Sequence, residues 1–287
     1  MAKLICGCGY LGLRVANRWL ASGAVVWATT RSTQRAAELE ALGIKPIIAD
    51  VTRRFVLPSD GNDIDTVIFA VGFDRSPGQD IEQVYVRGLE HVLGGMNDRL
   101  QRFIYVSSTG VYEESRGQWV DEETPSHPLR AGGRACLQAE RRLAESAFAD
   151  RRIVLRLAGL YGPGRLPKLA AVQTGEPIES TEDGYLNLIH IDDAAEIVSS
   201  TEDWVSPPAT ILVADGNPVR RGDFYRELAR QLNAPPPRFA PPQATSSAGE
   251  RGSTDKRVSN RKLISIYPRP LSYPSYREGL ASIVAVK

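Results

Sequence analysis

The chain has 287 residues, of which 42% are hydrophobic and 24% charged, a length that fits one large domain or one domain with a smaller lobe. Its net charge of +1 gives no electrostatic basis for binding nucleic acid or an anionic membrane. No apolar run is long enough to span a bilayer, and the first one ends at Gly7, too early for a secretion signal. Because three cysteines give no disulfide framework, we expect a cytoplasmic protein.

The first predicted elements flank a glycine-rich turn. Leu4-Ile5-Cys6 predicts a buried strand and residues 13–20 predict an amphipathic helix. Between them lies a GxGxxG motif, which comprises Gly7, Cys8, Gly9, Tyr10, Leu11 and Gly12. In such a motif one glycine permits a turn with positive φ, a second lets a pyrophosphate approach the backbone, and the third lets the helix pack closely. The turn therefore predicts a dinucleotide site at the positive end of the helix, and an ordinary tight turn is the alternative.

Strands and helices then alternate along the chain. Further strands are predicted at residues 25–28, 44–49, 66–71, 103–106 and 153–155. Helices are predicted at residues 33–42, with Ser32 as N-cap, and at 79–96 and 133–148. This order predicts an α/β fold with a doubly wound parallel sheet of the Rossmann type.

The pattern changes after Tyr161, where Gly and Pro cluster. A helix at 194–200, a strand at 210–214 and a helix at 222–232 are predicted, followed by a loop at 235–254 and an irregular tail at 263–287. We therefore expect a dinucleotide-binding domain over residues 1–160, its sheet completed by about 187–214. Residues 161–186 and 215–287 are expected to form a small C-terminal substrate lobe.

The end of the second strand bears on the type of cofactor. An acidic residue there would bind the ribose 2′-hydroxyl of NAD, but the chain has Thr30, Arg31 and Ser32, and no acid before Glu38. A guanidinium and hydroxyl groups suit a 2′-phosphate. We hypothesise NADP as the cofactor, with NAD as the alternative. Arg31 as a solvated residue at a helix start is the plainer interpretation.

Several further motifs follow the same strands. They are Ala49-Asp50-Val51, Ala70-Val71-Gly72, VSSTGVY at 106–112, LRLAGLYGPG at 155–164 and NLIHIDD at 187–193. With the glycine-rich turn, they resemble an extended short-chain dehydrogenase/reductase of the NAD-dependent epimerase/dehydratase type, in its atypical branch. The resemblance implies that Asp50 and Val51 contact adenine. It also implies that Ala70, Val71, Gly72 and Ser107 lie beside the cofactor.

The family's chemistry is hydride transfer at a nicotinamide ring. A tyrosine exchanges the substrate proton, a lysine four residues later lowers its pKa, and a serine binds the reacting oxygen. Ser108 matches that serine, and Glu140 matches the glutamate that ends the pattern. Counting back from Glu140 puts Cys136 at the lysine position and Gly132 at the tyrosine position. None of the six lysines follows a tyrosine by four residues, so the pair is absent.

Other residues are candidates for the missing chemistry. Tyr112, just after Ser108, is a candidate proton donor, although the family usually has a tyrosine there for structural or substrate-contact reasons. His127 is a candidate acid or base, with an exposed loop residue as the alternative. Cys136 is a candidate nucleophile, with a buried apolar filler as the alternative. No metal site is expected, because one C-x-C at Cys6 and Cys8 is poor zinc spacing.

The substrate is indicated only faintly. Gly159 stands where nucleotide-sugar enzymes of the family carry asparagine, which weakens that substrate class. Arg165, Asn187 and His190 are candidate substrate residues, and Asp192 or Asp193 is expected to cap the next helix. The helices at 79–96 and 133–148 resemble a family dimer interface, so a homodimer is predicted as one alternative.

Three functions stay open. The first is an NAD(P)-binding oxidoreductase or epimerase with non-standard chemistry. The second is a non-catalytic NADP(H)-binding sensor or regulatory protein. The third is an active reductase or epimerase in which Tyr112 and Ser108 carry the proton steps.

Overall fold

The computed structural model describes residues 1–73, 80–112, 116–241 and 255–284. The chain divides into two compact units. The first comprises Met1–Val111, Ser126–Arg156 and Ala195–Ile211, and the second comprises Tyr112–Pro125, Leu157–Ala194 and Leu212–Lys287. The second unit therefore includes residues 112–125, a segment that the sequence analysis places in the dinucleotide-binding domain.

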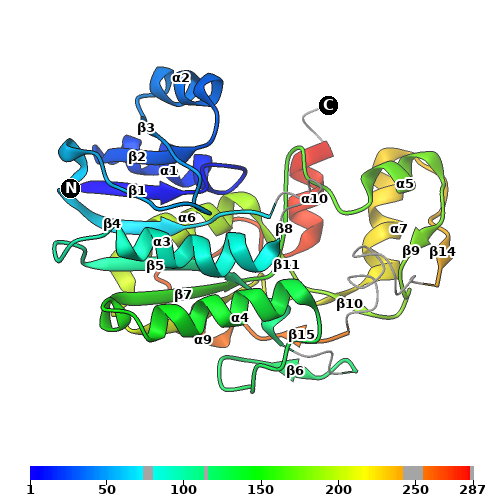
Figure 1. Cartoon of the computed structure of the whole chain (residues 1–287). Helices are drawn as coiled ribbons and strands as arrows, with labels where there is room; N and C mark the ends of the chain where they lie inside the picture. Colours follow the sequence, from blue (N-terminus) through cyan, green and yellow to red (C-terminus); the bar gives the residue numbers. More distant parts are fainter. Residues whose placement is uncertain (74–79, 113–115, 242–254, 285–287) are drawn as a thin grey trace. The chain divides into compact units, whose positions relative to one another are not determined.

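The first unit is built around a parallel sheet (Figure 1). In the described residues its strands are β1 (Ala2–Cys6), β2 (Val25–Thr30), β3 (Lys45–Ile48), β4 (Ile64–Phe69), β5 (Arg102–Ser108), β7 (Arg152–Leu157) and β12 (Ala209–Val213). Their order is β12-β7-β5-β4-β1-β2-β3, so the chain starts in the middle and builds outward to both edges. This is the doubly wound Rossmann arrangement that the sequence predicts.

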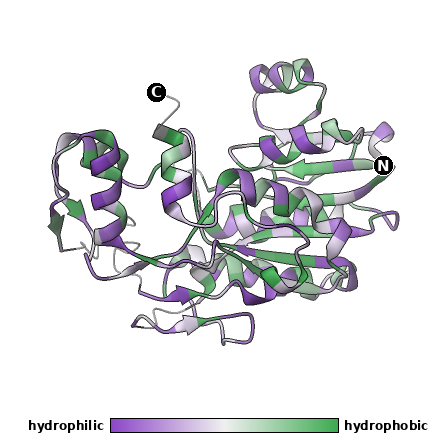
Figure 2. Ribbon diagram, turned by 180° about the vertical axis from the view of Figure 1, so that it is seen from behind, coloured by the Kyte–Doolittle hydropathy of each residue, from purple (hydrophilic) through white to green (hydrophobic). Residues whose placement is uncertain are grey.

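The strands of this sheet are apolar because helices cover both of its faces. Leu4, Ile5, Val67 and Ile68 are all fully buried, and the central strands are mostly green in Figure 2. Strands buried on both faces read as continuous hydrophobic runs rather than alternating ones. The sheet thus forms the core of the first unit. The segments that are predicted to contact the cofactor follow the carboxyl ends of its strands.

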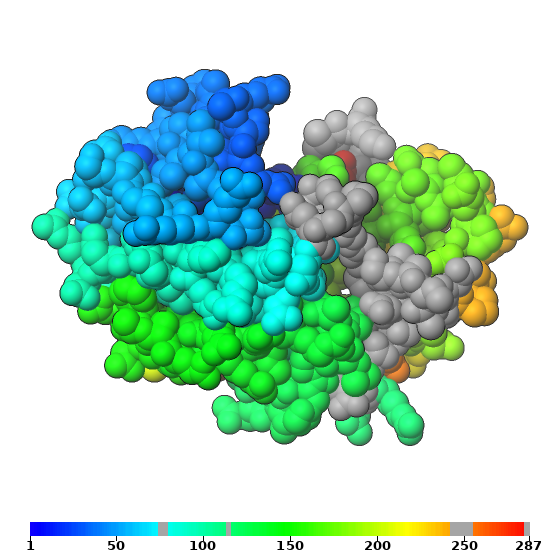
Figure 3. Space-filling model, in the orientation of Figure 1, coloured from blue at the N-terminus to red at the C-terminus, as the bar shows by residue number. Residues whose placement is uncertain are grey.

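Helices α1 (Gly12–Ala21), α2 (Thr33–Ala41), α3 (Gly88–Gly94), α4 (Ala131–Ala144) and most of α6 (Ile191–Trp204) belong to this unit, together with the short turns η1 (Ser59–Gly61), η3 (Thr109–Val111) and η4 (Ala149–Arg151). Helices α3 and α4 face the viewer in Figure 1, and their cyan and green residues lie side by side on the surface in Figure 3. The Ser32 hydroxyl accepts a hydrogen bond from Arg35 N, which confirms the predicted cap. The expected helix at 79–96 is described from residue 80, and there a π-helical turn η2 (Gln83–Arg87) precedes α3.

The second unit combines short strand pairs with four helices in its described part. The pairs are β8 (Gly159–Tyr161) with β11 (Leu188–His190), β10 (Tyr185–Leu186) with β13 (Val219–Arg220), β9 (Ile178–Glu179) with β14 (Phe239–Ala240), and β6 (Trp119–Val120) with β15 (Arg257–Val258). The helices are α5 (Leu169–Thr174), α7 (Arg221–Leu232), α9 (Arg261–Ile266) and α10 (Tyr276–Val284). Tyr161, Phe224, Leu228 and Leu280 lie in its hydrophobic core.

Two predictions for the C-terminal third are wrong. The tail predicted as irregular forms α9 and α10, which bury Leu263 and Leu280 completely. Three prolines between these short helices hide their periodicity, and packing of α10 on the unit's own core supplies stability that its local sequence lacks. Within the expected loop at 235–254, residues 239–240 form β14, and 242–254 lie outside the described residues.

The predicted N-cap at Asp192 or Asp193 is also wrong, because both residues lie inside the first turn of α6. The buried Asp193 carboxylate instead accepts hydrogen bonds from Ser272 N (2.8 Å) and Tyr273 N (2.9 Å). It therefore holds the segment that leads into α10, a long-range contact that the local sequence pattern does not reveal.

Candidate functional site

Two glycines of the GxGxxG turn are required by the fold itself. Gly7 has φ +97°, and a Cβ at this position would lie 2.5 Å from Ala70 O. A Cβ on Gly12 would lie 2.4 Å from Gly7 O. Any side chain at either position would force the turn away from β4 or open the start of α1. These glycines therefore keep the turn tight against the carboxyl edge of the sheet.

Gly9 and Gly72 differ, because open space lies before them. Apart from the adjacent residues in the chain, no described atom comes within 4 Å of a Cβ built on either residue. Helix α1 begins beside Gly9 without a side-chain cap at Leu11 and without an acidic residue in its first turn. Open space next to the positive end of a helix fits a pyrophosphate group, which needs close backbone approach and N–H donors. We call the open space beside Gly9 and Gly72 the cradle, and it leaves room for a diphosphate group.

The thiols around the turn are structural. Burial raises the pKa of Cys6 to about 12, against the opposing hydrogen bond from Thr29. Burial also raises the pKa of Cys8 to about 11, and the charge of Arg35 offsets this only partly. Both thiols therefore stay protonated near neutral pH. Across the described ranges, no group of three or more His, Cys, Asp or Glu is placed to hold a metal ion.

Asp50, a predicted adenine contact, is held as a carboxylate. Its Oδ1 accepts hydrogen bonds from Thr52 N (2.9 Å) and Thr52 Oγ1 (2.8 Å). Partial burial raises the pKa of Asp50, but the Thr52 hydrogen bonds and the charges of Arg31 and Arg53 outweigh burial, so the pKa is lowered. The structure therefore brings the charge of Arg31, at the end of β2, close enough to act on Asp50, at the end of β3.

The neighbouring predicted residues also lie along this edge. Arg31 is exposed, and Thr30 Oγ1 accepts a hydrogen bond from Ser32 N (3.3 Å), so the segment is ordered ahead of α2. Val51 is buried, and its carbonyl oxygen lies 2.9 Å from His91 Nδ1 on α3. Residues 30–32 and 50–51 thus form adjoining loops at the carboxyl ends of two paired strands, where nucleotides bind in open α/β sheets.

The segment after β4 is tied to the π-helical turn. Ala70 N donates to Cys6 O (2.7 Å), and Phe73 N donates to the Tyr85 hydroxyl (3.2 Å). Between these two contacts, Val71 is half-buried and Gly72 is exposed. Tyr85 is a residue that the sequence analysis missed, because nothing in a regular helical pattern signals a π-helical turn. Such turns are frequent at functional sites.

The two serines that end β5 have different surroundings. The buried Ser107 donates from Oγ to Glu140 Oε1 (2.5 Å), and Glu140 is also bound by Arg156 Nη2 (2.6 Å). Ser108 is half-buried, and its Oγ accepts a hydrogen bond from Gly110 N (3.0 Å). The Ser107 hydroxyl therefore belongs to a buried polar network under α4, whereas the Ser108 hydroxyl lies at the surface of the first unit.

Position 136, where the family pattern calls for lysine, lies on the buried face of α4. Burial raises the pKa of Cys136 to about 11, against hydrogen bonds from Tyr105 and Ser107 that lower it. A protonated thiol cannot supply the positive charge or the nucleophile that the alternatives for this position require. The two lysines of the first unit are both paired with carboxylates: Lys3 with Glu202, and Lys45 with Asp60.

His127 is exposed and lies in the first unit, and the other remaining candidates belong to the second unit. Tyr112 is almost fully buried, and its carbonyl oxygen accepts a hydrogen bond from Lys256 Nζ (3.2 Å). The Asn187 side-chain amide binds the backbone at β15: it donates to Lys256 O (2.9 Å) and accepts from Val258 N (2.7 Å). Arg165 is exposed on a turn closed by backbone hydrogen bonds with Gly162.

His190 is packed rather than exposed. Its ring is about 1% exposed and lies 3.8 Å, centroid to centroid, from the ring of Tyr273. Asp215, which the sequence analysis missed, is similarly buried at the end of β12 and accepts from Asn217 N (2.9 Å). Burial raises the pKa of Asp215 to about 8, against the Asn217 hydrogen bond, and the nearby charges of Asp193 and Glu278 raise it further. The sequence did contain a signal for Asp215, because this acidic residue directly follows the apolar strand predicted at residues 210–214.

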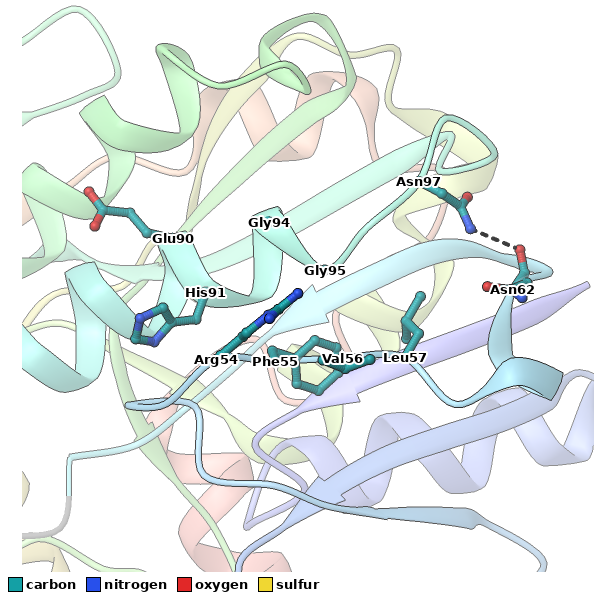
Figure 4. Close-up of a pocket in the computed structure, with 10 residues that line it drawn as sticks. All are labelled: Arg54, Phe55, Val56, Leu57, Asn62, Glu90, His91, Gly94, Gly95 and Asn97. Atoms are coloured by element: carbon teal, nitrogen blue, oxygen red, sulfur yellow. Dashed lines mark hydrogen bonds between the residues drawn. The ribbon is translucent and has the colours of Figure 1, made fainter.

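A separate cavity of about 480 Å³ lies in the first unit between residues 54–57 and α3 (Figure 4). Its lining comprises Arg54, Phe55, Val56, Leu57, Asn62, Glu90, His91, Gly94, Gly95 and Asn97. None of these residues is among the predicted cofactor contacts. The cradle at Gly9 and Gly72 is therefore a different part of the molecule.

The chain is similar to several known proteins. The model of a family described as NAD(P)H-binding matches residues 7–182. Protein YeeZ of Escherichia coli (strain K12) is 29% identical over 284 residues, which cover 94% of this chain and 97% of YeeZ. A solved structure from Methylobacillus flagellatus, described as an NAD-dependent epimerase/dehydratase, is 30% identical with a TM-score of 0.77, covering 99% of this chain and 98% of that one.

A further solved structure, MoeE5 in complex with UDP-glucose and NAD, has a TM-score of 0.79 at 22% identity, covering 99% of this chain and 98% of MoeE5. At that identity the likeness concerns the fold.

Within the described residues, none of the helices is both long enough and apolar enough to cross a membrane.

Proposed function

Because the chain belongs to the NAD(P)H-binding family and is similar to extended short-chain dehydrogenases and epimerases, we propose that it is an oxidoreductase of this type that prefers NADP(H). The observation that carries the proposal is the cradle at Gly9 and Gly72, where open space adjoins an uncapped helix start. Arg31, at the end of β2, supports NADP(H) because a guanidinium pairs with a 2′-phosphate through parallel hydrogen bonds.

The residues divide the work as follows. When bound, a nicotinamide cofactor supplies hydride exchange at its ring. The turn at residues 7–12 offers backbone N–H groups to the diphosphate, and Asp50 offers a carboxylate to the adenine amino group. The Ser108 hydroxyl already accepts from Gly110 N, so its own hydrogen remains to bind an oxygen of the substrate.

Arg31→Ala is expected to weaken NADPH binding about tenfold and leave NADH binding unchanged, because only NADPH carries the 2′-phosphate. Titration of purified protein with each nucleotide, followed by nicotinamide fluorescence, measures both affinities. Arg54→Ala, which removes another exposed arginine of the same unit, serves as the matched control and should alter neither affinity. Equal losses for the two nucleotides in Arg31→Ala would contradict the NADP(H) assignment.

A second candidate function is a sensor that binds NADP(H) without turnover. It is favoured by α4, where Gly132 and the protonated Cys136 occupy the positions of the family's tyrosine and lysine. Binding of NADPH without hydride exchange against any carbonyl would support the sensor. Turnover that Tyr112→Phe abolishes, at unchanged cofactor affinity, would instead support a reductase that uses Tyr112 and Ser108. A homodimer stays a prediction, which sedimentation of the purified protein can test. A cytoplasmic location also stays a prediction.

A further inference from the structure

Helix α4 begins in close contact with the turn after β5. A Cβ built on Gly133 would lie 2.1 Å from Gly110 O and 2.8 Å from Pro128 Cβ, so only glycine permits this approach. Arg130 is the N-cap residue of α4 and has extended backbone geometry. The close packing therefore sets the base of the Arg130 side chain beside the end of β5.

The Ser108 hydroxyl and the Arg130 guanidinium converge at Gly110. A Cβ built on Gly110 would lie 3.2 Å from Ser108 Oγ and 3.5 Å from Arg130 Nη2. Both atoms lie within contact distance of the position that a side chain at residue 110 would occupy, so a glycine there lets the hydroxyl and the guanidinium come close together. Both side chains are half-buried, so a ligand that reached them would displace part of their water.

Among the described residues, the charge beside these two groups is positive. The first turn of α4 has no acidic residue and no side-chain cap, so its positive end adds to the charge of Arg130. Two nearby carboxylates are engaged elsewhere: Glu140 binds Arg156 and Ser107, and Glu82 accepts from Gln138 Nε2 (3.0 Å). Among the residues that the structure describes, no carboxylate forms an ion pair with Arg130.

We propose that Arg130 and Ser108 bind the carboxylate of the substrate, which is accordingly a small carboxylic acid that carries the reacting carbonyl or alcohol. This inference rests on the proposed oxidoreductase function. A planar guanidinium and one hydroxyl match the two oxygens of a carboxylate, and one cation balances its single negative charge. Arg130 thus binds the substrate, a role that differs from those of the tyrosine and the lysine in the family pattern.

Calorimetric titration with oxamate, a non-reducible carboxylate, tests the proposal without any turnover. Oxamate is titrated into the wild-type chain with and without saturating NADPH, and oxamide serves as the uncharged counterpart. We expect oxamate to bind and oxamide not to bind. Arg130→Ala should weaken oxamate binding about tenfold or more, Arg130→Lys should restore part of it, and Ser108→Ala should weaken it less. Arg141→Ala, on an exposed position of the same helix, is the matched control.

The outcomes separate the two proposals. Oxamate binding that is unchanged in Arg130→Ala, or equal binding of oxamide, overturns the carboxylate assignment. So does the absence of oxamate binding in a wild-type chain that still binds NADPH, or preferential binding of inorganic phosphate tested in the same way. A wild-type chain that binds no NADPH contradicts the proposed function, and the titration without NADPH then still reports on Arg130 and Ser108. Unfolding temperatures of all variants show that each one is folded.

Discussion

Gly9→Val is expected to reduce NADPH affinity about a hundredfold or more while leaving the free energy of unfolding nearly unchanged. The cradle space next to Gly9 contains no described atom within 4 Å of a Cβ, so the fold tolerates a side chain there. The same side chain occupies the space of the diphosphate and removes several charge-assisted hydrogen bonds at once. Fluorescence titration gives the affinity and thermal unfolding gives the stability.

Gly7→Val provides the contrast to Gly9→Val. Its Cβ would meet Ala70 O at 2.5 Å, and a branched residue at φ +97° is strained, so we expect a loss of more than about 2 kcal/mol in the free energy of unfolding. NADPH binding that survives in Gly9→Val would mean that the open space is not the cofactor cradle. Equal destabilisation by both variants would mean that Gly9 is required by the fold.

Asp215→Asn is expected to stabilise the chain increasingly as the pH rises from 4 to 8. Burial raises the pKa of Asp215 from an ordinary value of 3.8 to about 8, so between these values the folded chain holds a proton that the unfolded chain has released. Folding stability therefore falls with increasing pH over this range, and asparagine removes that dependence. We expect a gain of about 2 kcal/mol or more at pH 8 and little gain at pH 4.

Thermal unfolding of the wild type and of Asp215→Asn across this pH range checks the expectation. Asp98→Asn, which neutralises an exposed carboxyl group, is the matched control and should leave the pH dependence of the wild type unchanged. Parallel pH profiles for Asp215→Asn and the wild type would show that Asp215 is ionised in the folded chain.

The parts of the fold that were predictable from sequence depend on short-range patterns. The strand, glycine turn and helix at the N-terminus, and the Ser32 cap, each lie within a few consecutive residues whose backbone geometry their own types dictate. The buried parallel strands read as apolar runs for the same reason. The π-helical turn at Gln83–Arg87 and helices α9 and α10 were missed, because their stability comes from packing on distant segments.

The same distinction between local pattern and long-range packing applies to the candidate site. Sequence alone determined that a GxGxxG turn joins the first strand to the first helix and that no tyrosine is followed by a lysine four residues later, since both are properties of residue order. Only the tertiary structure decided that Ser107 is buried against Glu140, that Asn187 is taken up by β15, and that Arg130 stands beside Ser108. These side chains meet partners that are distant in the sequence or depend on where α4 begins, so their roles are set by how the chain packs.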